Sequence, residues 1–163
     1  MNTQSFPDER ARTQEVLALA AHKACQYLAA VERRSVAPTD AALAALAAFH
    51  EPFPNASSDP LEVISMLDKI GSPATVATTG GRYFGFVIGG TLPASLAANW
   101  LAASWDQNAC LRVMSPVAAE LEEVVLGWIS EAIGLPEECP GGLVTCATMA
   151  NFTALTAARG ALL

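Results

Sequence analysis

The composition of this 163-residue chain excludes several classes of protein before any motif is considered. A net charge of −7 provides no basic surface with which to neutralise phosphates, so nucleic acid is not an expected partner. Only 15% of the residues are charged and 52% are hydrophobic, against about 25% charged residues in an average soluble domain. We therefore expect either a membrane or further protein to cover part of its apolar surface.

The first seventy residues are expected to form helical arms rather than a closed domain. Apolar residues recur at helical spacing over residues 9–34, which predicts one long helix. Thr39 is an N-cap candidate for an alanine-rich helix that reaches about residue 50. Asp59, an N-cap candidate followed by proline, predicts a third helix that ends at Gly71.

An apolar stretch follows a loop predicted over residues 71–81. Residues 83–105 are uncharged and long enough to span a bilayer. They are interrupted by glycine, proline, serine and asparagine and lack a flanking Lys/Arg bias, so burial in protein is favoured over burial in lipid. Residues 92–106 are predicted to form a buried helix, apolar on nearly every side. The polar N-terminus shows no secretory signal.

Two further helices are predicted in the second half. Ser115 and the proline after it begin one, which ends at Gly134 and Pro136. Residues 141–146 are a short strand-like run, and a helix is expected from Met149 to about Arg159.

The turn between that strand and helix, Ala147-Thr148, has the geometry that binds phosphate. The first N–H groups of a helix have no internal partners, and the helix dipole favours an anion there. Ala147 lets the backbone come close, and the Thr148 hydroxyl can act either as an ordinary N-cap or as a donor to a phosphate oxygen. On spacing alone, both interpretations remain open.

Cysteine usage indicates neither a metal site nor a disulfide framework. The four cysteines have no C-x-x-C pair, and neither histidine lies at ligand spacing from them. We expect reduced, mostly buried thiols at Cys25, Cys110, Cys139 and Cys146.

Three stretches, taken together, resemble one known family. Residues 82–94 resemble the F-G-F-V-x-G-G-S-L-P-A segment of group II pyridoxal-dependent decarboxylases, which include the aromatic-amino-acid and glutamate decarboxylases. Residues 115–128 are similar to that family's S-P-x-x-x-E-L-E-x-x-V-x-x-W helix. Residues 145–159 resemble its T-x-[GA]-[ST]-x-A-N-x-x-A-L-x-x-A-R segment, which holds the cofactor phosphate. The order and spacing of all three agree.

The resemblance implies a fold, an activity and an assembly. It implies a mostly helical chain, with a helical N-terminal arm over residues 1–80. Residues 81–163 would begin the α/β large domain of a fold-type I (aspartate-aminotransferase-like) enzyme. The implied activity is that of an amino-acid decarboxylase (a carboxy-lyase) using pyridoxal 5'-phosphate. A cytoplasmic homodimer with exchanged arms is expected, with no membrane partner.

Individual roles carry over only where residues match. The resemblance implies that Ala147 and Thr148 hold the cofactor phosphate. It also implies a substrate pocket lined near the substrate carboxylate by Phe86, Val87, Ile88 and Gly89. Phe86 and Ile88 would serve equally well as core residues.

Two other pairs of residues bear on the same resemblance. Cys110 and Arg112 fall in the segment that reaches toward the partner subunit's active site in this family. Cys146 and Met149 depart from the commonest glycine and glutamate of the phosphate segment, which affects packing around the turn.

No catalytic residue is assigned from the sequence. In this family the stacking imidazole, the carboxylate at the pyridine nitrogen and the Schiff-base lysine all follow the phosphate segment, whereas Lys23 and Lys69 precede it. The chain alone is therefore expected to be inactive. Two alternatives are a non-catalytic interaction module that pairs with another protein, and a truncated gene product without independent function.

Overall fold

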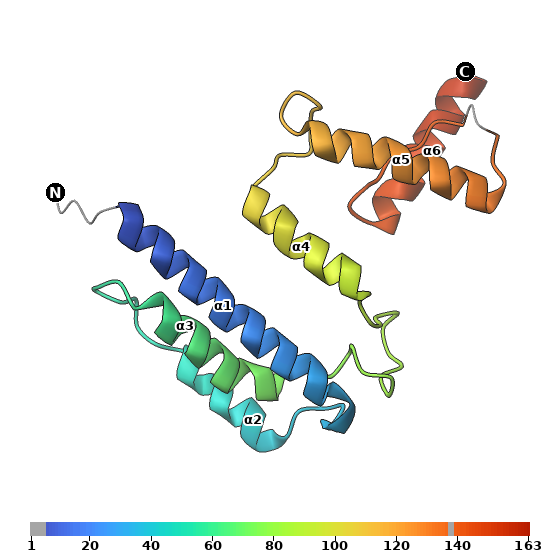
Figure 1. Ribbon diagram of the computed structural model, residues 1–163. Helices are drawn as coiled ribbons and strands as arrows, with labels where there is room; N and C mark the ends of the chain where they lie inside the picture. The colour runs from blue at the N-terminus through green and yellow to red at the C-terminus, as the bar shows by residue number, and fades with distance from the viewer. Residues whose placement is uncertain (1–5, 137–138) are drawn as a thin grey trace. The chain divides into compact units, whose positions relative to one another are not determined.

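The computed structural model describes residues 6–136 and 139–163, and every regular element in these ranges is helical (Figure 1). The chain divides into two compact units, Met1–Pro93 and Ala94–Leu163. The mostly helical character expected from the sequence is confirmed, whereas the α/β large domain remains an implication of the family resemblance. The division into residues 1–80 and 81–163 stays a prediction.

The N-terminal unit contains the three predicted helices, and each continues into a segment of different helical geometry. Helix α1 packs against α3 in this unit. The elements in chain order are α1 (Phe6–Ala30), η1 (Val31–Arg33), α2 (Asp40–Ala45), η2 (Leu46–Phe49), α3 (Pro60–Met66), η3 (Leu67–Gly71) and η4 (Ser72–Ala74).

The predicted N-caps of this unit are confirmed. The Thr39 hydroxyl accepts a hydrogen bond from the Ala42 N–H at 3.2 Å, and the Asp59 carboxylate accepts one from the Leu61 N–H at 2.9 Å. Asp59 also pairs with Arg12 of α1. The Leu61 N–H, followed by the Arg12 guanidinium, lowers the pKa of Asp59 because both favour the charged carboxylate. A second ion pair joins α1 to η3, between Lys23 and Asp68 at 3.0 Å.

The C-terminal unit contains α4 (Pro93–Trp105), α5 (Pro116–Ile133) and α6 (Ala147–Leu162). Helix α5 begins and ends where its sequence signals predict. The Ser115 hydroxyl accepts from the Ala118 N–H at 3.4 Å, and Gly134 adopts a left-handed conformation with φ 71°. The N–H of Leu135 then returns to the Ser130 carbonyl at 2.9 Å, which closes the helix end.

Two secondary-structure predictions for the C-terminal unit are wrong. Residues 141–146 form no strand, because a strand needs a neighbour to pair with and none is present in the described ranges. The N–H of Leu143 instead donates to the Glu122 carboxylate at 3.0 Å. Helix α6 begins at Ala147 rather than Met149 and runs past Arg159 to Leu162.

The predicted burial is also wrong at several places. Residues 93–105 form the expected helix α4, but none of them is buried, and Trp105 is 50% exposed. All four cysteines are free and exposed, not buried. Burial depends on what surrounds a side chain, and among the described residues only Val31 and Ala77 are buried hydrophobic ones. In the described part of the chain, no helix has both the length and the apolar character needed to cross a bilayer.

Candidate functional site

The start of α6 has the features of an anion-binding site. Its N-cap residue, Cys146, is extended (φ −163°, ψ 166°) and makes no side-chain capping hydrogen bond. The first hydrogen bond of the helix runs from the Ala150 N–H to the Cys146 carbonyl at 3.0 Å. The N–H groups of Ala147, Thr148 and Met149 therefore lie ahead of the regular hydrogen-bonding pattern, at the positive end of the helix dipole.

Two of these N–H groups change the pKa of the Cys146 thiol. The pKa of Cys146 is lowered, mainly because the Met149 N–H favours the thiolate, with a smaller contribution from the Thr148 N–H and an opposing effect of desolvation. The thiol makes no capping hydrogen bond of regular geometry, and the Thr145 and Thr148 hydroxyls add smaller contributions that also lower the pKa of Cys146. A negative charge is thus stabilised at this end of the helix.

These residues fit a phosphate group. A phosphate needs several converging donors and no bulky side chain in its path, and Ala147 contributes only a methyl group beside its N–H. The interpretation of Thr148 as an ordinary N-cap is wrong, because Cys146 holds that position and Thr148 is the second residue of the helix. The exposed hydroxyl of Thr148 is consequently not used to cap α6.

The predicted substrate-pocket residues form a tight turn in the N-terminal unit. The Ile88 N–H donates to the Gly85 carbonyl at 3.0 Å, and both central residues have positive φ, 52° at Phe86 and 54° at Val87. That geometry suits Asn-Gly, and for bulky residues it costs about 1–2 kcal/mol each. Both side chains are exposed, Phe86 at 91%. Backbone strain of this kind concentrates at functional sites.

The residues of the predicted substrate pocket lie close to one another, and so do those of the predicted phosphate site, but the two sets lie in different units. Phe86, Val87, Ile88 and Gly89 share one turn and its exit in the N-terminal unit, whereas Ala147 and Thr148 share the first turn of α6 in the C-terminal unit. The core alternative for Phe86 and Ile88 is not realised, because both side chains are exposed.

Arg112, predicted to lie toward a partner subunit, is held by two carboxylates of α5. It pairs with Glu120 at 2.9 Å and with Glu123. The hydrogen bonds that Arg112 donates to the two carboxylates, with that to Glu120 contributing most, raise the pKa of Arg112 further above its ordinary range. Cys110 lies nearby in sequence and is exposed, and its N–H bonds the Asn108 side chain at 2.9 Å. Sequence reasoning missed the ion pairs because the partners are eight and eleven residues apart across a loop.

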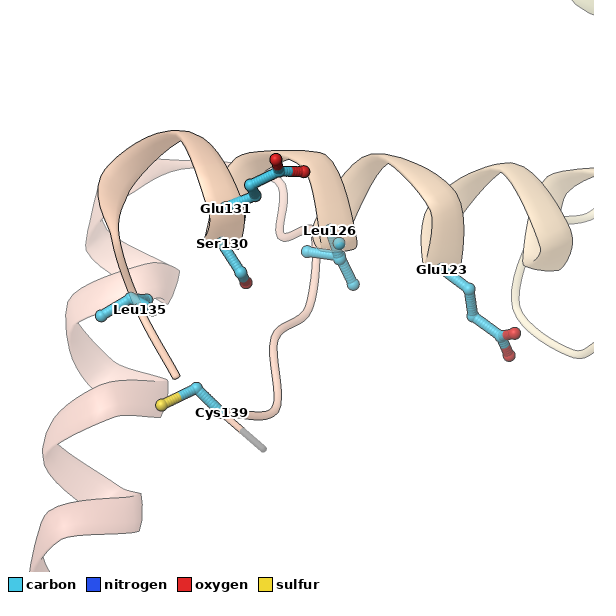
Figure 2. Close-up of a pocket in the computed structure, with 7 residues that line it drawn as sticks. Glu123, Leu126, Ser130, Glu131, Leu135 and Cys139 are labelled. Carbon is cyan, nitrogen blue, oxygen red and sulfur yellow. The ribbon is translucent and has the colours of Figure 1, made fainter. Parts of the chain in front are cut away.

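Figure 2 shows a cavity of about 670 Å³ beside α5, which none of the predicted site residues lines. Two carboxylates contribute to its wall and would repel a phosphate. The six residues labelled there are Glu123, Leu126, Ser130, Glu131, Leu135 and Cys139. This cavity is accordingly not the phosphate site.

Comparison with known proteins connects these features to a chemistry. Residues 48–163 match the conserved domain of pyridoxal-dependent decarboxylases. A curated relative, the aromatic-L-amino-acid decarboxylase of Bacillus atrophaeus, is 27% identical over 111 residues. That alignment covers 68% of this chain and 23% of the relative, so the chain spans about a quarter of the relative's length. No solved structure matches the chain. The family resemblance inferred from the three sequence stretches is confirmed.

Proposed function

The chain belongs to the pyridoxal-dependent decarboxylase family, and on that basis we propose that it supplies the phosphate-holding and substrate-pocket segments of an amino-acid decarboxylase. The observation that carries the proposal is the start of α6, where the N–H groups of Ala147, Thr148 and Met149 precede the regular helical hydrogen bonds and the N-cap side chain makes no capping hydrogen bond, within the residues that match the family. The family match supports this function over a non-catalytic interaction module.

Within this proposal, Ala147 and Thr148 hold the phosphate of pyridoxal 5'-phosphate. The N–H groups at the helix start donate to the phosphate oxygens, and the Thr148 hydroxyl adds one charge-assisted hydrogen bond. The cofactor supplies an electron-accepting ring that takes up the electron pair left when a bond to the amino-acid α-carbon breaks. Fixing the phosphate fixes the orientation of that ring, and a misplaced reacting bond costs on the order of a hundredfold in rate.

Phe86, Val87, Ile88 and Gly89 are proposed to line the substrate pocket. Their turn presents two large apolar side chains, Phe86 and Val87, beside the small Gly89. Such a wall suits the side chain of an apolar or aromatic amino acid. An aromatic L-amino acid is the first substrate to test, because the relative from Bacillus atrophaeus is named for that class.

The Schiff-base lysine is not assigned within these residues. Lys23 is engaged by Asp68 in an ion pair between α1 and η3, and Lys69 lies next to that pair in η3. Because this chain spans about a quarter of the relative's length, we propose that its residues position the cofactor and substrate for groups that the complete enzyme provides.

Replacing Thr148 tests the phosphate assignment. In the native-length protein, Thr148→Ala should weaken binding of pyridoxal 5'-phosphate by about 1–3 kcal/mol, because one charge-assisted hydrogen bond is lost. Cofactor absorbance titration measures the Kd. Thr153→Ala, on the same helix, is the matched control and should leave the Kd unchanged. Equal affinity in Thr148→Ala and wild type would overturn the assignment.

A further inference from the structure

The stretch that leads into the predicted pocket turn is held against residues 31–36, which follow α1. The N–H of Ala77 donates to the Val36 carbonyl at 3.0 Å. Ala77 is 2% exposed and Val31 is 7% exposed. Gly80 lies so close to Val31 that a Cβ built at Gly80 would be 3.4 Å from a Val31 methyl group. The two buried apolar side chains of the described ranges thus lie at this junction.

Charged side chains secure the same junction. The Glu32 carboxylate accepts a hydrogen bond from the Gly81 N–H at 3.1 Å. The Arg34 guanidinium donates to the Ser72 hydroxyl at 3.2 Å and to the Ser72 carbonyl. Arg82 in turn donates to the Arg34 carbonyl. These contacts hold both ends of residues 72–82 against residues 31–36.

Tyr83 is half-buried, and beyond it the side chains are largely free of the rest of the unit. Phe84 is 94% exposed, and the Phe86 and Val87 side chains are also in solvent. The backbone hydrogen bond that closes the turn, from Ile88 to Gly85, is internal to it. The position of the turn is therefore set at its base, where Glu32 meets Gly81, and not by contacts at its tip.

We propose that Glu32 and Arg34 are positioning residues for the substrate pocket: they fix the base from which residues 83–89 extend. This inference rests on the proposed function, in which Phe86 to Gly89 contact substrate. Glu32 gives the sharper test, because its carboxylate reaches the pocket segment through the single amide of Gly81, whereas Arg34 also stacks on the Tyr27 ring at 4.5 Å within the arm.

The test compares Glu32→Ala with Glu32→Gln in the native-length holoenzyme. Glu32→Ala removes the acceptor and should raise KM for the amino acid about fivefold, with kcat and cofactor affinity unchanged, because a pocket wall is loosened without touching the reacting atoms. Glu32→Gln keeps a carbonyl acceptor and should restore KM to within about twofold of wild type. Glu51→Ala, an exposed loop residue of the same unit, is the control.

Hydrogen exchange supplies a readout that does not depend on activity. The Gly81 amide should exchange faster in Glu32→Ala, which removes its acceptor, and at the wild-type rate in Glu32→Gln. The Ile88 amide, whose hydrogen bond is internal to the turn, should exchange at the wild-type rate in both variants. An unchanged KM, an unchanged Gly81 exchange rate in Glu32→Ala, or a Glu32→Gln variant as impaired as Glu32→Ala would each overturn the positioning role. A wild-type enzyme that decarboxylates no amino acid would instead contradict the proposed function, while exchange at Gly81 would still decide whether Glu32 anchors the segment.

Discussion

The thiol of Cys146 lies where α6 begins, and the N–H groups that lower its pKa are those proposed to hold the phosphate. A lowered pKa means that the thiolate forms at lower pH than in an ordinary thiol. The pH profile of iodoacetamide alkylation at Cys146, followed by peptide mass spectrometry, should therefore have a midpoint below that of a model thiol. A midpoint at or above the model value would show that the helix start does not stabilise an anion.

Phosphate provides the matching control on the same residue. Thiolate and phosphate need the same donors, so inorganic phosphate should slow alkylation of Cys146 and shift its midpoint upward. Exposed Cys25, in the other unit, reports any general effect of the salt on reactivity. Sequence comparison marked Cys146 as a departure from the family's usual glycine. The effect on its pKa could not be predicted, because it depends on where the neighbouring N–H groups point.

The turn from Gly85 to Ile88 has positive φ at two consecutive bulky residues, Phe86 and Val87, which its sequence disfavours. Val87→Gly should stabilise the closed turn by about 1 kcal/mol, because glycine adopts positive φ without a steric penalty. Exchange of the Ile88 amide, which bonds the Gly85 carbonyl, should then slow about fivefold. Phe84→Gly, outside the positive-φ pair, should not slow it. Faster exchange of the Ile88 amide in Val87→Gly would contradict the inference that the positive φ of Val87 strains the turn.

Helix ends were predictable to the extent that they are encoded locally. The caps at Thr39, Asp59, Ser115 and Gly134 each use a side chain or glycine within a few residues of the helix end, so the sequence specifies them. The strand expected at residues 141–146 does not form, because strand pairing depends on residues elsewhere and cannot be read from a local pattern. The prediction that α4 is buried was wrong for the same reason, because burial also depends on residues elsewhere.

At the scale of the whole molecule, large apolar side chains remain exposed. Trp128 of α5 is 67% exposed and Leu155 of α6 is 72% exposed. We expect a homodimer, in which such surface is covered. Light scattering of the native protein should give twice the polypeptide mass determined by mass spectrometry. A particle of one polypeptide mass at micromolar concentration would contradict the homodimer.

The candidate site was predictable where it is contiguous in sequence. Ala147 and Thr148 follow each other in one motif, and the motif resembled a known family segment. The Glu32–Gly81 contact joins residues 49 positions apart, and no local pattern marks either partner. Positioning residues of this kind can be identified only in the folded structure, because their role depends on a distance in space.

Helix α5 carries both of its end signals, Ser115 and Gly134, within its own 18 residues and their immediate flanks. These end signals define where the helix begins and ends, but most of the stability of such a helix comes from packing of its apolar face against other residues. During synthesis the residues that follow α5 leave the ribosome after it, so its apolar side chains have no partner there until those residues have been made. Apolar side chains of α5 such as Trp128 and Ile129 then face water on the nascent chain, where chaperones bind such surfaces. The rate at which the following segments emerge sets how long this helix stays vulnerable to aggregation.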